Sequence, residues 1–538
     1  MATPSPVRRR VAQPFGAGVL AAAASVMLLA VACSPNGFPT RETQEPATPV
    51  ATVPSAADTV AAVATASAPA PHATSPPETS AAPRDCSPRA APAELDFDTA
   101  AVPLSIEISR ALYECADEVG LGFARDPATA LTLTAHGIRG PMLLIESWSA
   151  ADAMDEIRRL APERIIAAGF SEQILELRLA GYAVEQVPVD PEAALPVADV
   201  PHERVLVVGD ASQAAVIGAV GSQIGATAVA VTGDLRALAA PERQVLRDAV
   251  HVEIHTDLGP DAEWQLEVIR RGDELPGGGL LVFGPDGSRR IVALYGHPTT
   301  SQLGVLGEQN PDDGVERLRT IAEGYDADGR EVVLAFEIIA TVASAQAGRD
   351  GDYSNETAHD VIRPWIETAA ANDMYVVLDL QSGRTDFLTQ AKQYEEFLRL
   401  PHVGLALDPE WRLKPGQVHL RQIGTVDAAE INQVSAWLAD LVRSEALPQK
   451  LLLLHQFRFS MITNRELIET PPELAVMIHM DGQGPLNTKY TTWDALLGLP
   501  DADRYYWGWK NFYDEDSPTA TAPQVLALTP SPLFVSYQ

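Results

Sequence analysis

Residues 403–411 read VGLALDPEW, an apolar run that ends in Asp408, Glu410 and Trp411. Such a run, bounded by a turn-forming Asp-Pro, is typical of a buried β-strand. Comparable segments recur along the C-terminal half of the chain. They are RIVALYGHP (290–298), EVVLAFEII (331–339), MYVVLDLQ (374–381), KLLLLHQF (450–457), LAVMIHMDG (474–482), RYYWGWKNF (504–512) and PLFVSYQ (532–538).

Helical patterns separate most of these strands. They are DDGVERLRTIAEGY (312–325), ETAHDVIRPWIETAAAN (356–372), DFLTQAKQYEEFLRL (386–400) and DAAEINQVSAWLADLVRSE (427–445). Strands that alternate with helices over about 250 residues predict an α/β fold of the (β/α)8 type, a TIM-type barrel, over residues 288–538. An open, doubly wound sheet is the competing architecture, and the number of strands favours the barrel.

Polar residues gather where these strands end. In a parallel barrel, chemistry occurs at the carboxyl ends of the strands, and residues two apart share a face. The candidates are Tyr295, His297, Glu337, Asp379, Gln381, Asp408, Glu410, His455, His479, Asp481, Trp507, Trp509 and Lys510. This distribution predicts a polar pocket at one end of the barrel.

Carboxylates surrounded by aromatic side chains suit glycoside hydrolysis, in which one acid protonates the leaving oxygen and a second acts as base or nucleophile. The catalytic candidates are Glu410, Asp408, Asp481, Asp379 and Glu337. The expected substrate contacts are Tyr295, His297, Gln381, Trp411, His455, His479, Trp507, Trp509 and Lys510. This chemistry requires no metal or other cofactor, and none is predicted.

Asp408-Pro409-Glu410 resembles the Asp-x-Glu motif on the fourth strand of chitinase-type and related wall-lytic barrels. The resemblance implies that Glu410 is the acid, that Asp408 tunes it, and that Asp481 or Asp379 is its partner. The longer acidic run of chitinases is missing, and strand seven lacks the Glu nucleophile of many retaining barrels. The stretches LALDPEW, LLLHQF and YYWGWKNFYDED also resemble a barrel of uncharacterised actinobacterial lipoproteins, which implies no activity.

Two other functions remain open. His297, His455, His479 and Asp481 are residue types that bind divalent metals, and histidines ending strands five and six resemble those of amidohydrolase barrels. That family's His-x-His on strand one, its bridging lysine and its strand-eight Asp are absent. The second alternative is a barrel that only binds glycan or scaffolds the wall, because a fold does not imply an activity.

The N-terminus carries export signals. Residues 1–33 contain Arg8, Arg9 and Arg10, an apolar run and Cys33, the pattern of a secretory signal. The run resembles a bacterial lipoprotein signal, which implies lipidation of Cys33 and anchoring on the extracytoplasmic face of the membrane. Ala30 stands where that motif prefers Leu. Signal-peptidase cleavage after Ala32 and a retained transmembrane anchor are the alternatives.

Residues 34–95 are rich in Pro, Ala, Thr and Ser and contain few large apolar residues, so a disordered linker is expected. Beyond Cys33 the chain has two cysteines, Cys86 and Cys115. In an exported protein the pair predicts one disulfide that ties the end of the linker to the first domain. Two free buried thiols are the alternative.

Residues 96–285 form a separate α/β region. Strands are expected in 140–147 and 163–169, with a helix between them that Ser149 caps, so the sheet should be parallel. The unit is echoed weakly at 223–254. A strand–turn–helix at 205–221 lacks G-x-G-x-x-G and a P-loop lysine, which argues against a nucleotide site.

DPATALTLTAHGIRGPMLLIES and LAPERIIAAG resemble the cell wall-binding repeat type 2 family. The resemblance spans about 110–250 and implies non-covalent attachment to wall polymers. The family's Phe-x-Asp-Ala is absent, and Ala168-Gly169 replaces its closing Gly-Gly. A generic α/β domain with a packing role is the alternative.

The chain is strongly acidic, with 39 Lys and Arg against 72 Asp and Glu and a formal net charge of −33. Such a surface repels nucleic acids, so nucleic-acid binding is excluded as a function class. The partners expected are a cell-wall polymer or other glycan, and a membrane reached through the N-terminal lipid.

Overall fold

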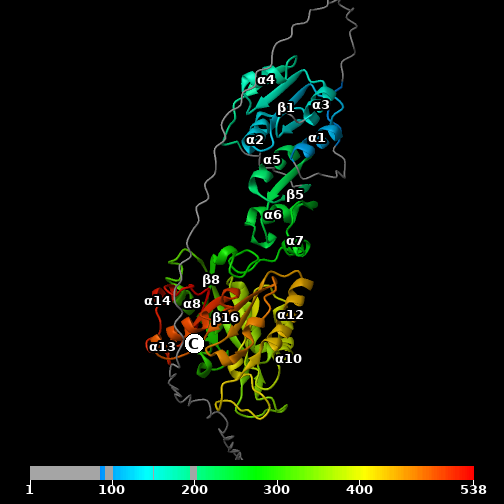
Figure 1. The fold of residues 1–538 in the computed structure, drawn as a ribbon. Coiled ribbons are helices and arrows are strands. Elements are labelled where there is room, and N and C mark those ends of the chain that lie inside the picture. Colours follow the sequence, from blue (N-terminus) through cyan, green and yellow to red (C-terminus); the bar gives the residue numbers. More distant parts are fainter. Residues whose placement is uncertain (1–84, 91–100, 149–150, 194–202) are drawn as a thin grey trace, which may run out of the picture. The chain divides into compact units, whose positions relative to one another are not determined.

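The computed structural model describes residues 85–90, 101–148, 151–193 and 203–538 (Figure 1). The predicted signal, Cys33, nearly all of the linker and the helix cap Ser149 lie outside these residues. The described chain forms an α/β protein, with small parallel sheets followed by a closed parallel barrel. Within the described ranges, no helix has the length and apolar character needed to cross a bilayer.

The first sheet is parallel and has the strand order β2-β1-β3-β4. Its strands are β1 (Glu118–Phe123), β2 (Met142–Ile145), β3 (Arg164–Ala168) and β4 (Ala183–Val187). Its helices are α1 (Ala101–Leu112), α2 (Pro127–His136), α3 (Ala151–Leu160) and α4 (Glu172–Arg178). The two predicted strands are β2 and β3, and the predicted parallel sheet is confirmed, with β1 between them.

Local sequence explains where α2 begins and ends. The Asp126 side chain accepts a hydrogen bond from the Ala128 N–H, Pro127 occupies the first turn, and Gly137 ends the helix in the left-handed region with φ 77°. A disulfide joins Cys86 to Cys115, as predicted.

The second sheet has the order β6-β5-β7 and is also parallel. It consists of β5 (Arg204–Val208), α5 (Ala211–Gly221), β6 (Ala226–Ala230), α6 (Ala240–Asp248) and β7 (His251–Ile254), and α7 (Ala262–Arg271) follows. In both sheets the first strand lies between the second and third. The weak sequence echo therefore corresponds to one β-α-β-α-β topology that occurs twice.

Residues 289–537 close into a barrel of eight parallel strands. The strands are β8 (Arg289–Gly296), β9 (Glu331–Ala343), β11 (Tyr375–Leu380), β12 (Val403–Leu407), β14 (Lys450–His455), β16 (Leu474–Met480), β17 (Tyr506–Asn511) and β18 (Phe534–Tyr537). Each falls on a predicted strand. Because β18 pairs with β8, the barrel prediction is confirmed and the open sheet is wrong.

Helices surround this barrel (Figure 1). They are α8 (Pro311–Ala322), α9 (His359–Ala371), α10 (Phe387–Ala391), α11 (Glu395–Leu398), α12 (Ala428–Ser444), α13 (Leu486–Leu497) and α14 (Ala522–Leu526). The helix predicted at 386–400 is divided into α10, a 3-10 turn and α11. A short strand, β10 (Ser354–Glu356), pairs antiparallel with the extended end of β9.

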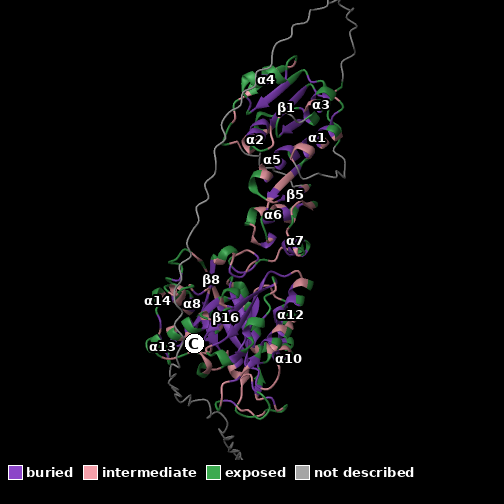
Figure 2. Cartoon of the chain, in the orientation of Figure 1, coloured by how far each residue is buried: buried purple, intermediate pink, exposed green. Residues whose placement is uncertain are grey.

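The residues of the barrel strands are mostly buried (Figure 2). Toward the amino ends of the strands the barrel interior is apolar, and its buried side chains form one cluster. The strand members of this cluster are Ile291, Ala293, Val333, Ala335, Tyr375, Val377, Ala406, Leu451, Leu453, Ala475, Met477 and Phe534. Because side chains alternate along a strand, the next residue that faces the interior comes two positions later, nearer the carboxyl end of the strand.

Arg290 stabilises the seam of the barrel, where the first strand, β8, pairs with the last, β18. It is fully buried, and its guanidinium donates to the Pro532 carbonyl at 2.8 Å and the Tyr325 carbonyl at 2.7 Å. It also forms a two-pronged ion pair with Asp328 at 2.9 and 2.8 Å. Its Nη2 also donates to Ser531 Oγ at 2.8 Å, so all five N–H groups of the guanidinium have an acceptor.

We expect Arg290→Met to lower the free energy of unfolding by about 3 kcal/mol, because it leaves two buried backbone carbonyls without their donor and Asp328 with Arg330 as its remaining ion-pair partner within the described chain. Urea denaturation followed by circular dichroism measures the change. Arg319→Met, which removes an exposed arginine of α8, should cost less than about 1 kcal/mol. Equal losses in the two variants would contradict this account of the seam.

Candidate active site

A layer of polar side chains lies on top of the apolar interior, with one residue from each strand. Each follows an interior residue by two positions, so the pleat directs it into the barrel. Each of these side chains is 3% exposed or less. The layer consists of Tyr295, Glu337, Asp379, Asp408, His455, His479, Lys510 and Ser536.

His455 lies at the centre of this layer, between carboxylates. Its Nε2 is 3.1 Å from Glu337 Oε1 and 3.6 Å from Asp379 Oδ1, and its Nδ1 is 3.1 Å from Asp481 Oδ2. Burial opposes a charge on the ring, but the surrounding carboxylates, Asp379 and Asp481 foremost, outweigh it and raise the pKa of His455 well above its usual value. The site therefore favours the protonated, imidazolium form of the ring.

Tyr295 orients Asp379. The tyrosine hydroxyl donates to Asp379 Oδ2 at 2.9 Å and accepts from Gln381 Nε2 at 3.3 Å. The ammonium of Lys510 lies 3.3 Å from the centroid of the Tyr295 ring, a cation–π contact. Burial raises the pKa of Asp379 to about 6, even though His455 favours its charge.

Glu410 stands nearer the surface than this layer. The Asp408 side chain accepts a hydrogen bond from the Glu410 N–H at 3.1 Å and so caps the 3-10 turn Pro409–Trp411. Burial, and after it the charge of Asp481, raises the pKa of Glu410 to about 7. The pKa of Asp408 is also raised, chiefly by burial.

Asp481 has the opposite shift. Burial disfavours its charge, but the charge of His455 and its hydrogen bond outweigh burial and lower the pKa of Asp481 below its usual value. Glu410 and Asp481 are thus neighbouring carboxyls, one protonated and one ionised near pH 6. Groups whose pKa values are separated in this way divide the roles of acid and base.

Aromatic side chains from three loops line the same end of the barrel. Trp411 packs against His419 with ring centroids 5.2 Å apart, and the His419 ring contacts the Tyr353 carbonyl through Nε2 at 2.9 Å. The Arg384 guanidinium lies 4.1 Å from the centroid of the Tyr353 ring. Phe457 lies beside Gly482, close to Asp481.

Of these residues, only Trp411 was predicted from the sequence. Tyr353, His419 and Phe457 belong to the loops that follow β9, β12 and β14. The signal that would have found them is the presence of an aromatic ring in a loop after the carboxyl end of a strand.

Trp507 and Trp509 do not lie in this site, which corrects the sequence prediction. Gly508 and Lys510 are the interior residues of β17, so alternation turns both indoles outward. Their rings pack on Trp493 of α13, with centroids 5.6 and 5.8 Å apart, and their N–H groups donate to Ala502 O and Asn511 Oδ1. They are core residues of the helix layer.

The strand-end histidines are held by other side chains. His297 contacts Thr357 Oγ1 through Nε2 at 3.0 Å and accepts from the Thr299 N–H through Nδ1 at 3.2 Å. His479 Nε2 is 2.9 Å from Ser536 Oγ, and burial lowers the pKa of His479 well below its usual value. Both nitrogens of His455 face carboxylates.

Within the described chain, the potential ligand atoms that converge belong to Asp350 and Asp352, between β9 and β10, and to Glu356, at the end of β10. None of them is a residue of the predicted metal set. Asp352 already accepts from the Ser354 N–H and from Thr385 Oγ1. The geometry therefore does not assemble His297, His455, His479 and Asp481 around a metal.

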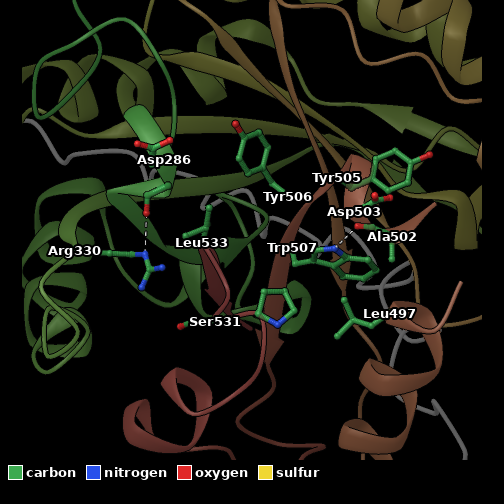
Figure 3. Close-up of a pocket in the computed structure, with 12 residues that line it drawn as sticks. Asp286, Arg330, Leu497, Ala502, Asp503, Tyr505, Tyr506, Trp507, Ser531 and Leu533 are labelled. Atoms are coloured by element: carbon green, nitrogen blue, oxygen red, sulfur yellow. Dashed lines mark hydrogen bonds between the residues drawn. The ribbon is translucent and has the colours of Figure 1, made fainter. Parts of the chain in front are cut away.

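A cavity of about 590 Å3 opens at the other end of the barrel (Figure 3). Its lining includes Tyr506, Trp507, Asp286 and Arg330, which belong to the amino ends of the strands. Arg330 Nε donates to the Gly287 carbonyl at 2.8 Å, so some of the polar groups that line this cavity already have a hydrogen-bond partner. The carboxyl-end cluster is the stronger candidate for chemistry.

No protein-family model matches the chain, and no curated protein matches it significantly.

A raised carboxyl pKa in the folded state makes the protein less stable as the pH rises from the unfolded pKa to the folded one. For Glu410 this window runs from about pH 4.5 to about 7. We expect Glu410→Gln to increase the free energy of unfolding by about 1–3 kcal/mol at pH 8, where the wild-type group is charged, and to change little at pH 4.5.

Urea denaturation at the two pH values measures this difference. Glu367→Gln, an exposed position of α9, serves as the control and should stay within about 0.5 kcal/mol at both. A Glu410→Gln variant that is less stable than wild type at pH 8 would show that the carboxylate is not destabilised by its site.

Proposed function

We propose that the barrel hydrolyses glycosidic bonds of a cell-envelope or extracellular glycan, with Glu410 as the general acid. The observation that carries this proposal is the pairing of Glu410, whose pKa is raised to about 7, with Asp481, whose pKa is lowered. A glycosidase needs one protonated and one ionised carboxyl beside the scissile bond.

Each group has a definite task in this reaction. Glu410 donates its proton to the oxygen of the leaving sugar as the glycosidic bond breaks. Asp481 stays ionised and acts on the opposite side of the ring, as nucleophile or as the base that activates water. Asp408 holds the backbone N–H of Glu410, while Trp411 and Phe457 offer apolar surface to sugar rings.

The same proposal includes a location. Export, lipidation of Cys33 and a linker over 34–95 would hold the folded regions outside the membrane, with the α/β region on wall polymer as its family resemblance implies. A disulfide between Cys86 and Cys115 is consistent with an oxidising, extracytoplasmic compartment. The partners proposed are glycan and, through the lipid, the membrane, with no nucleic acid.

Glu410→Gln and Asp481→Asn should each lower kcat on solubilised wall polysaccharide by about 10²–10⁴-fold, because each removes a proton donor or a charge used in the transition state. Release of reducing ends measures turnover. Glu367→Gln, on the outer face of α9, should retain wild-type kcat.

Binding separates the alternatives. If wild type and Glu410→Gln retain the glycan equally well and neither cleaves it, the barrel is a binding or scaffolding protein. If turnover is abolished by a chelator and restored by a divalent metal, the metal-dependent hydrolase replaces the proposal.

Activity should follow a bell-shaped pH profile. The alkaline limb should fall near pH 7, where Glu410 loses its proton, and the acid limb should lie below about pH 4, where Asp481 gains one. The profile of kcat/KM measures both limbs. An alkaline limb that is unchanged in a residually active Glu410→Asp variant would assign that limb to another group.

A further inference from the structure

We propose that Glu337 is a positioning residue that acts through His455 to keep Asp481 ionised, and that it neither donates a proton to the substrate nor attacks it. The inference deepens the proposed function, since it rests on the role given there to Asp481. Glu337 is then not one of the catalytic carboxyls, although the sequence predicted it to be.

The burial of Glu337 separates it from any substrate. Its side chain has no exposed surface, and it lies in the interior of β9 at the level of Tyr295. Asp481 retains some exposed surface, and Glu410 is only partly buried. Glu337 therefore lies beneath the groups that a glycan would reach.

The imidazole of His455 lies between the deeply buried Glu337 and the more accessible Asp481 and contacts both. Its Nε2 is 3.1 Å from Glu337 Oε1, whereas its Nδ1 is 3.1 Å from Asp481 Oδ2. Asp379 is farther from Nε2, at 3.6 Å, and its second oxygen is occupied by the Tyr295 hydroxyl. Glu337 thus makes the shortest ionic contact to the side of the ring that faces away from Asp481.

Glu337 has no other polar partner to explain its place in the barrel. Neither of its oxygens makes a conventional hydrogen bond within the described chain, where its ion pair is with His455, at 3.1 Å. A buried carboxylate without hydrogen bonds is costly, so the contact with His455 is the interaction that offsets this cost.

Titratable groups face His455 from nearly every strand of the barrel. Those with a direct contact or a charge interaction are Glu337, Asp379, Asp408, Glu410, Asp481, His479 and Tyr295, and Lys510 lies over the Tyr295 ring. The three carboxyls that contact the ring, Glu337, Asp379 and Asp481, favour the proton on it. Removing one carboxylate lowers the affinity of His455 for that proton.

The test uses the full chain labelled with ¹⁵N-histidine, in wild type and Glu337→Gln. The ring nitrogens of His455, assigned by loss of their signals in His455→Gln, report its protonation. The pKa of His455 should fall by about 1–3 units in Glu337→Gln. The acid limb of the kcat/KM profile should move to higher pH, with kcat at the optimum within about tenfold of wild type.

Glu331→Gln is the matched control. It makes the same change on the same strand, at the amino end where Glu331 pairs with Arg289, and it should leave the titration of His455 unchanged. Glu337→Asp keeps the charge but withdraws it from the ring, so it should give a smaller shift in the same direction. If Glu337→Gln does not fold, the His455 titration in Glu337→Asp still tests whether Glu337 holds the proton on the ring.

Two results would overturn the inference. A His455 titration that is unchanged in the Glu337 variants would show that Glu337 does not hold the proton. Loss of turnover at every pH, with His455 titrating normally, would make Glu337 a reacting group. If wild type cleaves no glycan, the proposed function fails, but the histidine titration still tests the link between Glu337 and His455.

Discussion

The contact of His455 with carboxylates on both of its ring nitrogens is the constraint on which the carboxyl end of the barrel depends. Three acids within 3.6 Å of one imidazole would repel each other in a dry interior without the proton that the ring carries. With that proton, Asp481 remains an anion. The anion in turn helps the neighbouring Glu410 retain its own proton at a pH where an exposed glutamate would be charged.

Most of the barrel could be predicted from its strands, because each is a short apolar run with a polar residue at its end. The positions of the polar residues near the strand ends also predicted that they gather at one end of the barrel, where Glu337, Asp379 and His455 lie in contact. The side-chain period of two failed for Trp507 and Trp509. A strand of a closed barrel is covered on both faces, so apolar residues occur on either side, and only the contact of Lys510 with Tyr295 reveals which side of β17 faces inward.

Contacts between distant loops were beyond prediction. VGLALDPEW correctly marked the fourth strand and its two acids, but it contains no sign that His419 packs on Trp411 or that Tyr353 lies beneath Arg384. In the N-terminal region the sequence echo was visible, whereas the existence of two separate sheets was not. That division depends on where β4 ends the first sheet and β5 begins the second. β5 is a short apolar run, whereas β4 (AVEQV) is partly polar and has no fully buried residue, so it gives little sign of a strand.

The Arg290 seam has a consequence for the order of folding. Arg290 and Pro532, which it bonds, are 242 residues apart, and β8 finds its second neighbour only when β18 arrives. Until then, the folding chain presents the free edge of β8 to its surroundings. Edges of this kind pair readily with other chains. A barrel of this topology therefore passes through an interval before closure in which pairing with another chain competes with the pairing of β8 and β18.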